Sequence, residues 1–412
     1  MVIRSISFST DTNKVDKLKK EREIKNFFKI ANKHFRKTDF AVRTNRLNLS
    51  PFSINQELEG SDIIGTIKWL SEFTSKNHIR WLSAPFYIQQ NKIMDINKIV
   101  LEILKRYDNV FVNYILAQNN EINRHGIYHA SKLVKSISRI SNNGFENFRF
   151  GALFNCEPNG PYFPFTYHNG ENGFSIALEL IPKFLEIVSN FGNKDIEVTR
   201  DNIIIELSPI LSEINDICIE ISNSSGVKFN GIDCSLAPFP DNDNGSIVNL
   251  IEKLGLDGFG GPGTLFFTSY LTNIIKSLIT KSNIKSIGFN GVMFSLLEDN
   301  LLSQKNNKRQ FSIDSLMAYS TVCGCGLDMV PIPGDVFDDE IASIMLDIAS
   351  ISCVLNKPLG VRLLPIPLKK ANEYTDFNHD FLYNTRVLNI TNRSCSMKLF
   401  EPSTPFTYLD HK

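Results

Sequence analysis

The chain has 412 residues, and its 44 basic side chains balance its 44 acidic side chains, which leaves a net charge of +0. With 42% hydrophobic residues it can bury a substantial core, and its length permits either two ordinary domains or one large barrel. A neutral chain has no long-range positive field to attract a polyanion, so nucleic-acid binding is not expected.

The cysteines and the amino terminus predict a cytoplasmic protein. Seven cysteines, an odd number, are scattered along the chain and do not form the framework of a disulfide-stabilised domain. The segment MVIRSISFST lacks the basic start and the small-residue cleavage site of a signal peptide. No uninterrupted apolar run is long enough to cross a bilayer, so a membrane partner is not expected.

Short runs rich in β-branched and aromatic residues recur along the chain and predict strands. In order they are Val2 to Phe8, Phe40 to Leu47, Ile79 to Ala84, Val110 to Leu116, Phe148 to Phe154, Val227 to Ala237, Ile287 to Phe294, Leu327 to Ile332 and Leu359 to Leu364. Apolar residues three and four positions apart predict helices between these runs. They are Val15, Leu18, Ile24, Phe27, Phe28 and Ala31 after the first run, and Ile341, Ile344, Met345, Ile348 and Leu355 before the last.

Strand and helix alternate about ten times, which predicts an α/β fold with a mainly parallel sheet that helices cover and that closes into a barrel. Neither a Pro-, Gly- or Ser-rich linker nor a change of composition divides the chain, so residues 1–412 are expected to form a single domain. After Leu368 the apolar pattern weakens and asparagines such as Asn378 and Asn392 become frequent. Residues 368–412 are therefore expected to wrap the outside.

The predicted strands contain or end in charged residues, namely Arg43, Arg46, Arg80, Arg149, Asp233, Asp328 and Arg362. Because an unpaired buried charge is costly, such residues should line a solvated or ligand-filled centre, or lie at strand ends. Side chains alternate along a strand, so Arg43 and Arg46 cannot both point inward unless a bulge or the strand end intervenes. The candidates to bind a carboxylate or phosphate are Arg43, Arg46, Arg149 and Arg362.

The segment CGCGLDMVPIPGD, from Cys323 to Asp335, combines two thiols, flexible glycines and two carboxylates. Two cysteines two positions apart on an extended backbone face the same side, which suits a thiol pair. Cys323, Asp328 and Asp335 are candidate catalytic residues, with Cys323 as a nucleophile. The alternative is a tight turn that holds two small buried thiols.

Residues 258–263 read GFGGPG and lead into a helical pattern. A dinucleotide-binding glycine loop should follow a strand, but residues 246–254 before it have a helical pattern, so that interpretation is rejected. Freed amides at a helix start could still hold a phosphate or carboxylate, and a close-packed connection that requires glycine has about equal weight. The candidate binding residues here are Gly260, Gly261, Gly263 and Thr264.

The loop from Cys156 to Gly173, CEPNGPYFPFTYHNGENG, is rich in proline, glycine and aromatic residues. This composition is typical of a segment that contacts a substrate. His168, near its end, is a candidate general base, although a hydrogen-bonded loop histidine is the commoner outcome.

Glu298 and Asp299 close the apolar run that starts at Ile287, at the carboxyl end where parallel α/β proteins place ligands. With other strand-end carboxylates they could assemble an oxygen-ligand site for Mg²⁺ or Ca²⁺. The same carboxylates are equally suited to pair with the strand arginines.

Several motifs, spread over most of the chain, carry a family resemblance. They are Arg43, Thr44 and Arg46; FRFGA from Phe148; PYFPFTYH from Pro161; GIDCSLAPFP from Gly231; FGGPGTL from Phe259; LLED ending at Asp299; CGCGLDMVPIPGD from Cys323; and KPLGVRLLP from Lys357. Together they resemble domain-of-unknown-function family 711, also called uncharacterised protein family 0210. The resemblance implies a ten-stranded α/β barrel similar to those of pyruvate formate lyase and the large ribonucleotide reductase subunit. It implies a fold and not a reaction, and it leaves a homodimer open.

Glycyl-radical chemistry, the reaction type of pyruvate formate lyase, requires a glycine in a loop near the carboxyl terminus. Gly360 is the last glycine of the chain, so polar chemistry is expected instead, unless a partner supplies the radical site. Of the two thiols, Cys323 is preferred over Cys325, because variety is expected at position 325 in the family.

The preferred hypothesis is an enzyme that binds a small anionic metabolite through the strand arginines. Asp233, Asp328, Asp335 or His168 would move protons. Two alternatives use the same features: a non-catalytic regulator that binds a small ligand, and a redox protein whose cysteines respond to oxidation.

Overall fold

The computed structural model describes residues 1–12, 16–53, 60–88, 92–190, 195–240, 243–391, 393–401 and 404–408. Val15 and Asn392, which belong to two of the sequence patterns, lie outside these ranges. The chain is a mixed α/β protein built on a large, mostly parallel sheet. None of the described helices is both long and apolar enough to pass through a membrane.

The first group of strands is parallel and follows chain order. It consists of β1 (Val2–Thr10), β3 (Asn45–Leu49), β4 (Ile79–Tyr87), β5 (Val110–Gln118) and β7 (Phe150–Phe154). The intervening helices are α1 (Lys17–Phe35), α2 (Gly60–Lys76), α3 (Ile93–Arg106) and α4 (Arg124–Ser138). A strand followed by a crossover helix is the unit from which parallel sheets are built, so the predicted alternation is confirmed here.

The second group contains two parallel pairs, β8 (Gly173–Glu179) with β9 (Lys228–Asp233) and β10 (Gly326–Pro333) with β11 (Leu359–Ile366). It joins the first group through antiparallel contacts of β8 with β1 and of β11 with β7. Its helices are α5 (Ile181–Asn190), α6 (Ile196–Ser225), α7 (Ile247–Lys253), α8 (Thr264–Ser282), α9 (Asn300–Asn307), α10 (Ile313–Tyr319) and α11 (Asp338–Val354). Strand β8 lies outside the predicted strands.

The predicted strand from Ile287 to Phe294 forms only isolated bridges. On one side Val292 pairs with Leu236, just beyond β9, and on the other Ser295 pairs with Asp328 of β10, both in parallel. Residues 286–295 therefore lie between β9 and β10. The shorter elements are β2 (Ala41–Val42), β6 (Glu121–Ile122), β12 (Phe406–Thr407), and the 3₁₀ helices η2 (Phe145–Arg149) and η3 (Met397–Leu399).

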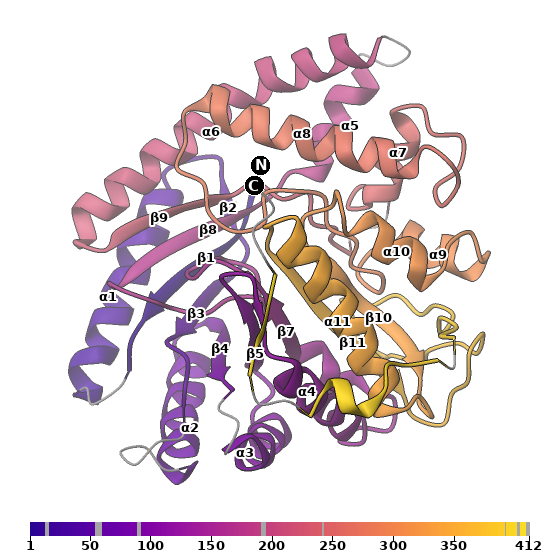
Figure 1. Ribbon diagram of the computed structural model, residues 1–412. Coiled ribbons are helices and arrows are strands. Elements are labelled where there is room, and N and C mark those ends of the chain that lie inside the picture. Colours follow the sequence, from indigo (N-terminus) through magenta and orange to yellow (C-terminus); the bar gives the residue numbers. More distant parts are fainter. Residues whose placement is uncertain are drawn as a thin grey trace.

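Helices surround the strands on the outer side of the sheet (Figure 1), and among them α2 packs on β4 and α11 on β11. Helix α1 buries Ile24, Phe27, Phe28 and Ala31, as the spacing predicts, and Phe27 stacks on Phe8 of β1 with ring centroids 4.7 Å apart. Each fully buried aromatic side chain of this kind contributes roughly 2–3 kcal/mol to folding. This apolar layer lies between the helices and the outer face of the sheet.

Residues after Leu368 run beside α9 and β10. The side-chain amide of Asn306 donates to the carbonyl of Arg386 at 2.6 Å, and the amide of Leu388 donates to the carbonyl of Pro331 at 3.0 Å. Further along, β12 pairs antiparallel with β6, so the last described strand returns to the first group.

Candidate functional site

The face of the sheet opposite the helices is polar, and it holds the loop of residues 156–172. We call it the polar face; it is formed by Ser5, Ser7, Asn48, Ser83 and Asn113. These small polar side chains are all fully buried. Strands that are buried on both sides normally carry apolar residues on both, so polar residues here need partners.

Backbone carbonyls of the loop supply those partners. The carbonyl of Pro161 accepts hydrogen bonds from Ser7 at 3.4 Å and from Arg46 Nη1 at 3.2 Å. The side-chain amide of Asn113 donates to the carbonyls of Pro164 and Thr166, both at 2.7 Å. The loop is therefore fixed from several strands at once.

A glycine on β11 allows the loop to approach this closely. A Cβ atom at Gly360 would lie 2.4 Å from the ring of Phe165, which no side chain could tolerate without displacing the loop. The loop consequently presents Tyr162 and Phe163 to a cavity at one end of the polar face.

The cavity has about 890 Å³ of space between protein atoms, part of it open to solvent. Five arginines line it together with two carboxylates and a series of aromatic side chains. The charged residues are Arg4, Arg43, Arg46, Arg80, Arg362, Glu298 and Asp328. The aromatic residues are Trp81, Phe111, Phe148, Tyr162, Phe163, Phe165, Phe239 and Phe381.

Arg43 and Arg46 both reach the cavity because the strand is interrupted between them. Strand β2 ends at Val42, β3 begins at Asn45, and the register to β4 shifts after Asn45. The spacing of three residues between Arg43 and Arg46 predicts such an interruption if both side chains are to point to the same side of the sheet. Arg43 is paired: its Nε and Nη2 donate to the two carboxylate oxygens of Glu179 at 2.6 and 2.8 Å, and its guanidinium stacks 3.8 Å from the centre of the Phe239 ring.

Arg46 is half-buried and has no ion pair with any residue that the structure describes. Its guanidinium donates to the hydroxyl of Thr44 at 3.3 Å and to the Pro161 carbonyl, which are both uncharged. Burial, and then the positive charge of Arg4, lower the pKa of Arg46 to about 9. The charge of Glu298 acts in the opposite direction. Arginine keeps its proton in proteins, so the lowered pKa expresses the free-energy cost of holding this cation in a desolvated site beside another cation.

Arg4 and Arg80 are also without ion pairs among the described residues. Arg4 lies at a register shift in β1 and donates to the carbonyl of Pro238 at 2.8 Å. The exposed Arg80 lies over the rings of Trp81 and Phe381, 5.0 and 4.5 Å from their centres. Cations over aromatic faces are stabilised without being neutralised, so this part of the cavity stays positive.

Arg362, Asp328 and Glu298 form a buried network in the cavity wall. Arg362 donates from Nε to Asp328 Oδ1 at 2.6 Å and from Nη2 to Asp328 Oδ2 at 2.9 Å and Glu298 Oε2 at 3.2 Å. Burial raises the pKa of Asp328, although the charge and hydrogen bonds of Arg362 oppose this shift. Glu298 Oε2 also accepts from Ser295, whereas its Oε1 accepts no hydrogen bond from the residues that are described.

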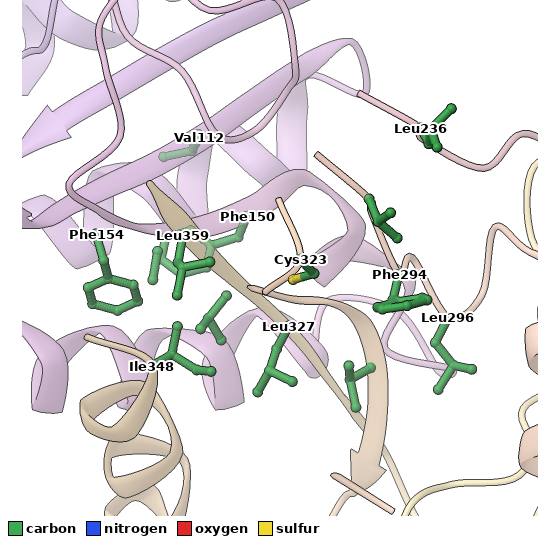
Figure 2. Close-up of a cluster of buried hydrophobic side chains, with 14 of the residues drawn as sticks. Val112, Phe150, Phe154, Leu236, Phe294, Leu296, Cys323, Leu327, Ile348 and Leu359 are labelled. Atoms are coloured by element: carbon green, nitrogen blue, oxygen red, sulfur yellow. The ribbon is translucent and has the colours of Figure 1, made fainter. Parts of the chain in front are cut away.

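The two cysteines of the CGCG segment lie in different surroundings. Residues 323–325 are bends before β10 rather than extended backbone, so the predicted same-side arrangement does not occur on a strand. Cys323 packs among Phe294, Leu296 and Leu327 in the outer apolar layer (Figure 2). Cys325 instead lines the cavity beside Tyr162 and Met293.

The thiols nevertheless interact with each other. The pKa of Cys323 is lowered to about 6 by the Cys325 thiol above all, and also by the charge of Lys357 and the amides of Gly326 and Cys325, while burial acts in the opposite direction. The same interaction raises the pKa of Cys325, which burial raises further. A thiolate at Cys323 and a thiol at Cys325 is the arrangement that this environment favours.

Two other strand charges lie away from the cavity and have protein partners. Arg149 donates from Nη2 to the carbonyl of Leu104 at 2.6 Å and pairs with Glu146. Asp233 accepts from the hydroxyl of Ser235 at 2.5 Å and from the amide of Phe289 at 2.9 Å. Burial raises the pKa of Asp233, and these hydrogen bonds counter the shift. Neither residue lines the cavity.

The other candidates are also remote from the cavity lining. His168 is buried, with Nδ1 2.8 Å from Asn159 Oδ1, and burial lowers its pKa. Asp335 is exposed in the turn after β10.

Gly260, Gly261 and Gly263 lie in the connection before α8, which begins at Thr264, and the Gly260 amide donates to Thr264 Oγ1 at 3.0 Å. Gly260 has a φ of 100°, and a Cβ there would lie 2.3 Å from the carbonyl oxygen of Gln310. These contacts support the close-packed connection.

Glu298 and Asp299 point to different partners. Asp299 caps α9 and accepts from Ser246 Oγ at 2.6 Å and from the Ile247 amide at 2.9 Å, and burial raises its pKa to about 6. Within the described ranges, no group of three or more His, Cys, Asp or Glu side chains could hold a metal ion.

Several cavity residues were absent from the predicted site. Arg80 is one of the strand charges that the sequence identifies, although it is not among the predicted binding residues, and Arg4 carries the same signal, a charge within a predicted strand. Tyr162, Phe163 and Cys325 lie in loop segments without periodicity, so the sequence does not reveal which side chains face a cavity.

Comparison with known proteins finds relatives whose names state no activity. The family described as "Uncharacterised ACR (DUF711)" matches residues 1–381. A UPF0210 protein of Pyrobaculum aerophilum is 31% identical over 233 residues, 55% of this chain and 51% of the relative. One from Carboxydothermus hydrogenoformans is 28% identical over 282 residues, 67% of this chain and 62% of the relative.

A third relative, from Methanocaldococcus jannaschii, is 34% identical over 158 residues, 38% of this chain and 34% of the relative. The chain spans about half the length of the first curated relatives it matches. Since the family match extends over most of the 412 residues, the protein belongs to the DUF711 family, also named UPF0210.

Proposed function

We propose that the chain is an enzyme that binds a small carboxylate or phosphate in the arginine-lined cavity and transforms it by polar chemistry. The observation that carries this proposal is the unpaired guanidinium of Arg46, half-buried beside the equally unpaired Arg4. Two neighbouring cations, neither of which forms an ion pair with a described residue, repel each other in a partly desolvated site, and an anionic ligand would relieve that repulsion.

The opposite wall supplies the proton acceptor. Ser295 and Arg362 both donate to Oε2 of Glu298 and fix the orientation of its carboxylate. The other oxygen, Oε1, accepts no hydrogen bond from the described residues. Asp328 has both oxygens engaged by Arg362, so it positions Arg362, and through it Glu298. In this proposal Glu298 takes a proton from the carbon next to the carboxylate of the bound ligand, and the arginines stabilise the negative charge that the C–H electron pair places on the carboxylate oxygens.

The proposed site lies in a barrel. We propose that the sheet closes through residues 286–295, whose parallel bridges to Leu236 and Asp328 would connect β9 with β10. Five parallel strands would then face five others of the opposite direction, with antiparallel seams at β1–β8 and β7–β11. Such a ring is similar to the barrels of pyruvate formate lyase and the large ribonucleotide reductase subunit.

Ligand binding tests the first half of this proposal. Inorganic phosphate, acetate, phenyl phosphate and benzoate are titrated into the purified chain by calorimetry, with Arg46→Gln beside the matched surface substitution Arg200→Gln. Loss of a charge-assisted hydrogen bond should weaken anion binding at least about ten-fold in Arg46→Gln. Arg200, which pairs with Asp201 on the surface, should leave it unchanged. Equal affinities in all three proteins would refute the anion site.

Proton transfer tests the second half. Phenylacetate, an aromatic carboxylate with hydrogens on the carbon next to the carboxylate, is incubated with the enzyme in deuterated water, and the exchange of those hydrogens is followed by NMR. Glu298→Gln should abolish the exchange while it changes affinity only slightly. A ligand that binds through Arg46 but never exchanges or reacts would identify the alternative function, a non-catalytic binding protein.

A further inference from the structure

The hydroxyl of Tyr162 is buried in the cavity wall without a partner. The side chain is 7% exposed, and its oxygen forms no hydrogen bond within the described part of the chain. An unsatisfied buried hydroxyl costs about 1–3 kcal/mol, and such groups are uncommon in folded proteins. The position of this one, beside unpaired cations in a cavity, points to a ligand atom as the missing partner.

Contacts of the neighbouring backbone and side chains fix the position of Tyr162 in the cavity wall. The preceding carbonyl, that of Pro161, is held by Ser7 and by Arg46, and the guanidinium of Arg4 lies 5.7 Å from the phenol ring. Burial raises the pKa of Tyr162, so the phenol stays protonated and acts as a hydrogen-bond donor. Arg4, Arg46 and Tyr162 thus form one donor-rich end of the cavity.

Beside the charged residues, aromatic side chains make up much of the cavity wall. Phe111 makes edge-to-face contacts with Trp81, Phe148 and Phe163, at centroid distances of 5.2, 5.2 and 6.1 Å. A flat apolar group could add edge-to-face contacts of its own to these rings, which an inorganic anion could not do.

Resting on the proposed anion site, we infer that the cavity takes an aromatic carboxylate or an aryl phosphate, and that Tyr162 donates a hydrogen bond to an oxygen of its anionic group. The anion would lie between Tyr162 and Arg46, and the ring among Trp81, Phe111 and Phe163. Tyr162 is in this way a specificity-determining residue that positions the anion.

The experiment compares aromatic with small anions in two tyrosine variants. Benzoate and phenyl phosphate should bind the wild type at least about ten-fold more tightly than acetate and inorganic phosphate. Tyr162→Phe should weaken benzoate about ten-fold, the value of one hydrogen bond to a charged group. Tyr114→Phe is the matched control, because its buried hydroxyl donates to Asn97 Oδ1 at 2.7 Å outside the cavity.

Thermal unfolding without ligand provides an independent result. Tyr162→Phe should melt no lower than the wild type, because it removes a hydroxyl that has no partner, whereas Tyr114→Phe should melt lower. If Tyr162→Phe melts as low as Tyr114→Phe, or binds benzoate as the wild type does, the inference is overturned. If Arg46→Gln nevertheless loses anion binding, the proposed function still stands. The proposed function is refuted only if Arg46→Gln also binds anions as tightly as the wild type.

Discussion

Arg362 of β11 and Asp328 of β10 meet through two hydrogen bonds, Nε to Oδ1 at 2.6 Å and Nη2 to Oδ2 at 2.9 Å. Their side chains are 4% and 8% exposed, and Glu298 shares the same guanidinium. Because one guanidinium is hydrogen-bonded to two buried carboxylates, this pair is part of the folded core as well as of the cavity wall.

Removing the cation should therefore destabilise the fold strongly. Arg362→Met leaves Asp328 and Glu298 without their positive partner and should lower the free energy of unfolding by about 3–5 kcal/mol. The double variant Arg362→Met, Asp328→Asn removes one stranded carboxylate and should recover part of that loss. Urea unfolding of the two single variants and the double variant gives the coupling energy, expected at about 1–3 kcal/mol. Additive losses would show that the pair is not coupled.

Much of the fold could be predicted from the sequence, because burial against helices leaves a pattern that short runs reveal. The predicted β-branched runs lie within β1, β4, β5, β10 and β11 and identify those strands, and the spacing of Ile24, Phe27 and Phe28 identifies α1. Residues 286–295 have the same composition but pair only by isolated bridges. The sequence could not predict this difference, because composition does not reveal which hydrogen-bond partners a strand has.

The site could be predicted only in part, because charge is visible in a sequence and pairing is not. Arg46 and Arg149 look alike as strand arginines, yet one has no ion pair among the described residues and the other is bonded to Glu146 and to carbonyls. The partner of Arg43 is Glu179, 136 positions away. Such long-range contacts decide which charges remain available to a ligand.

Substitution of Arg149 should affect stability and not ligand affinity, which is the opposite of the expectation for Arg46. Arg149→Met removes hydrogen bonds to the carbonyls of Leu104 and Val110 and should lower the free energy of unfolding by about 2–4 kcal/mol. Benzoate affinity should remain that of the wild type, because Arg149 does not line the cavity. Urea unfolding and calorimetry on one preparation check both. A loss of affinity without a loss of stability would place Arg149 at the ligand after all.

Asp299 predicts a pH dependence of stability. Its pKa in the folded protein is raised to about 6 by burial, above the ordinary 3.8, so the folded state binds the proton more tightly than the unfolded state. Its contribution to stability is therefore greatest below pH 3.8 and is lost as the pH rises through about 6. In Asp299→Asn this contribution is absent, and the stability difference from wild type should shift in favour of the variant by roughly 3 kcal/mol between about pH 3 and pH 7.

Denaturant unfolding of both proteins at several pH values measures that shift. Only the difference between the two proteins is informative, because other carboxylates titrate in both. Benzoate binding should be the same in both proteins, since Asp299 bonds Ser246 and caps α9 rather than facing the cavity. A difference that stays constant with pH would contradict the raised pKa.

Cys323 should be a thiolate at neutral pH. Its pKa is lowered to about 6, first by the hydrogen bond from Cys325 and further by the charge of Lys357, although burial opposes this. Burial raises the pKa of other cysteines, including Cys156 to about 12 and Cys218, so a thiolate signal that appears near pH 6 is expected from Cys323.

The ultraviolet absorbance of thiolates, followed as the pH is raised, detects this step. Cys323→Ser should abolish it, and Cys325→Ala should move it to higher pH, because the alanine cannot donate to the sulfur. Lys357→Met should move it in the same direction by removing the nearby positive charge. If the step persists in Cys323→Ser, another cysteine carries the charge, and the thiol pair would be two ordinary buried thiols in a tight turn.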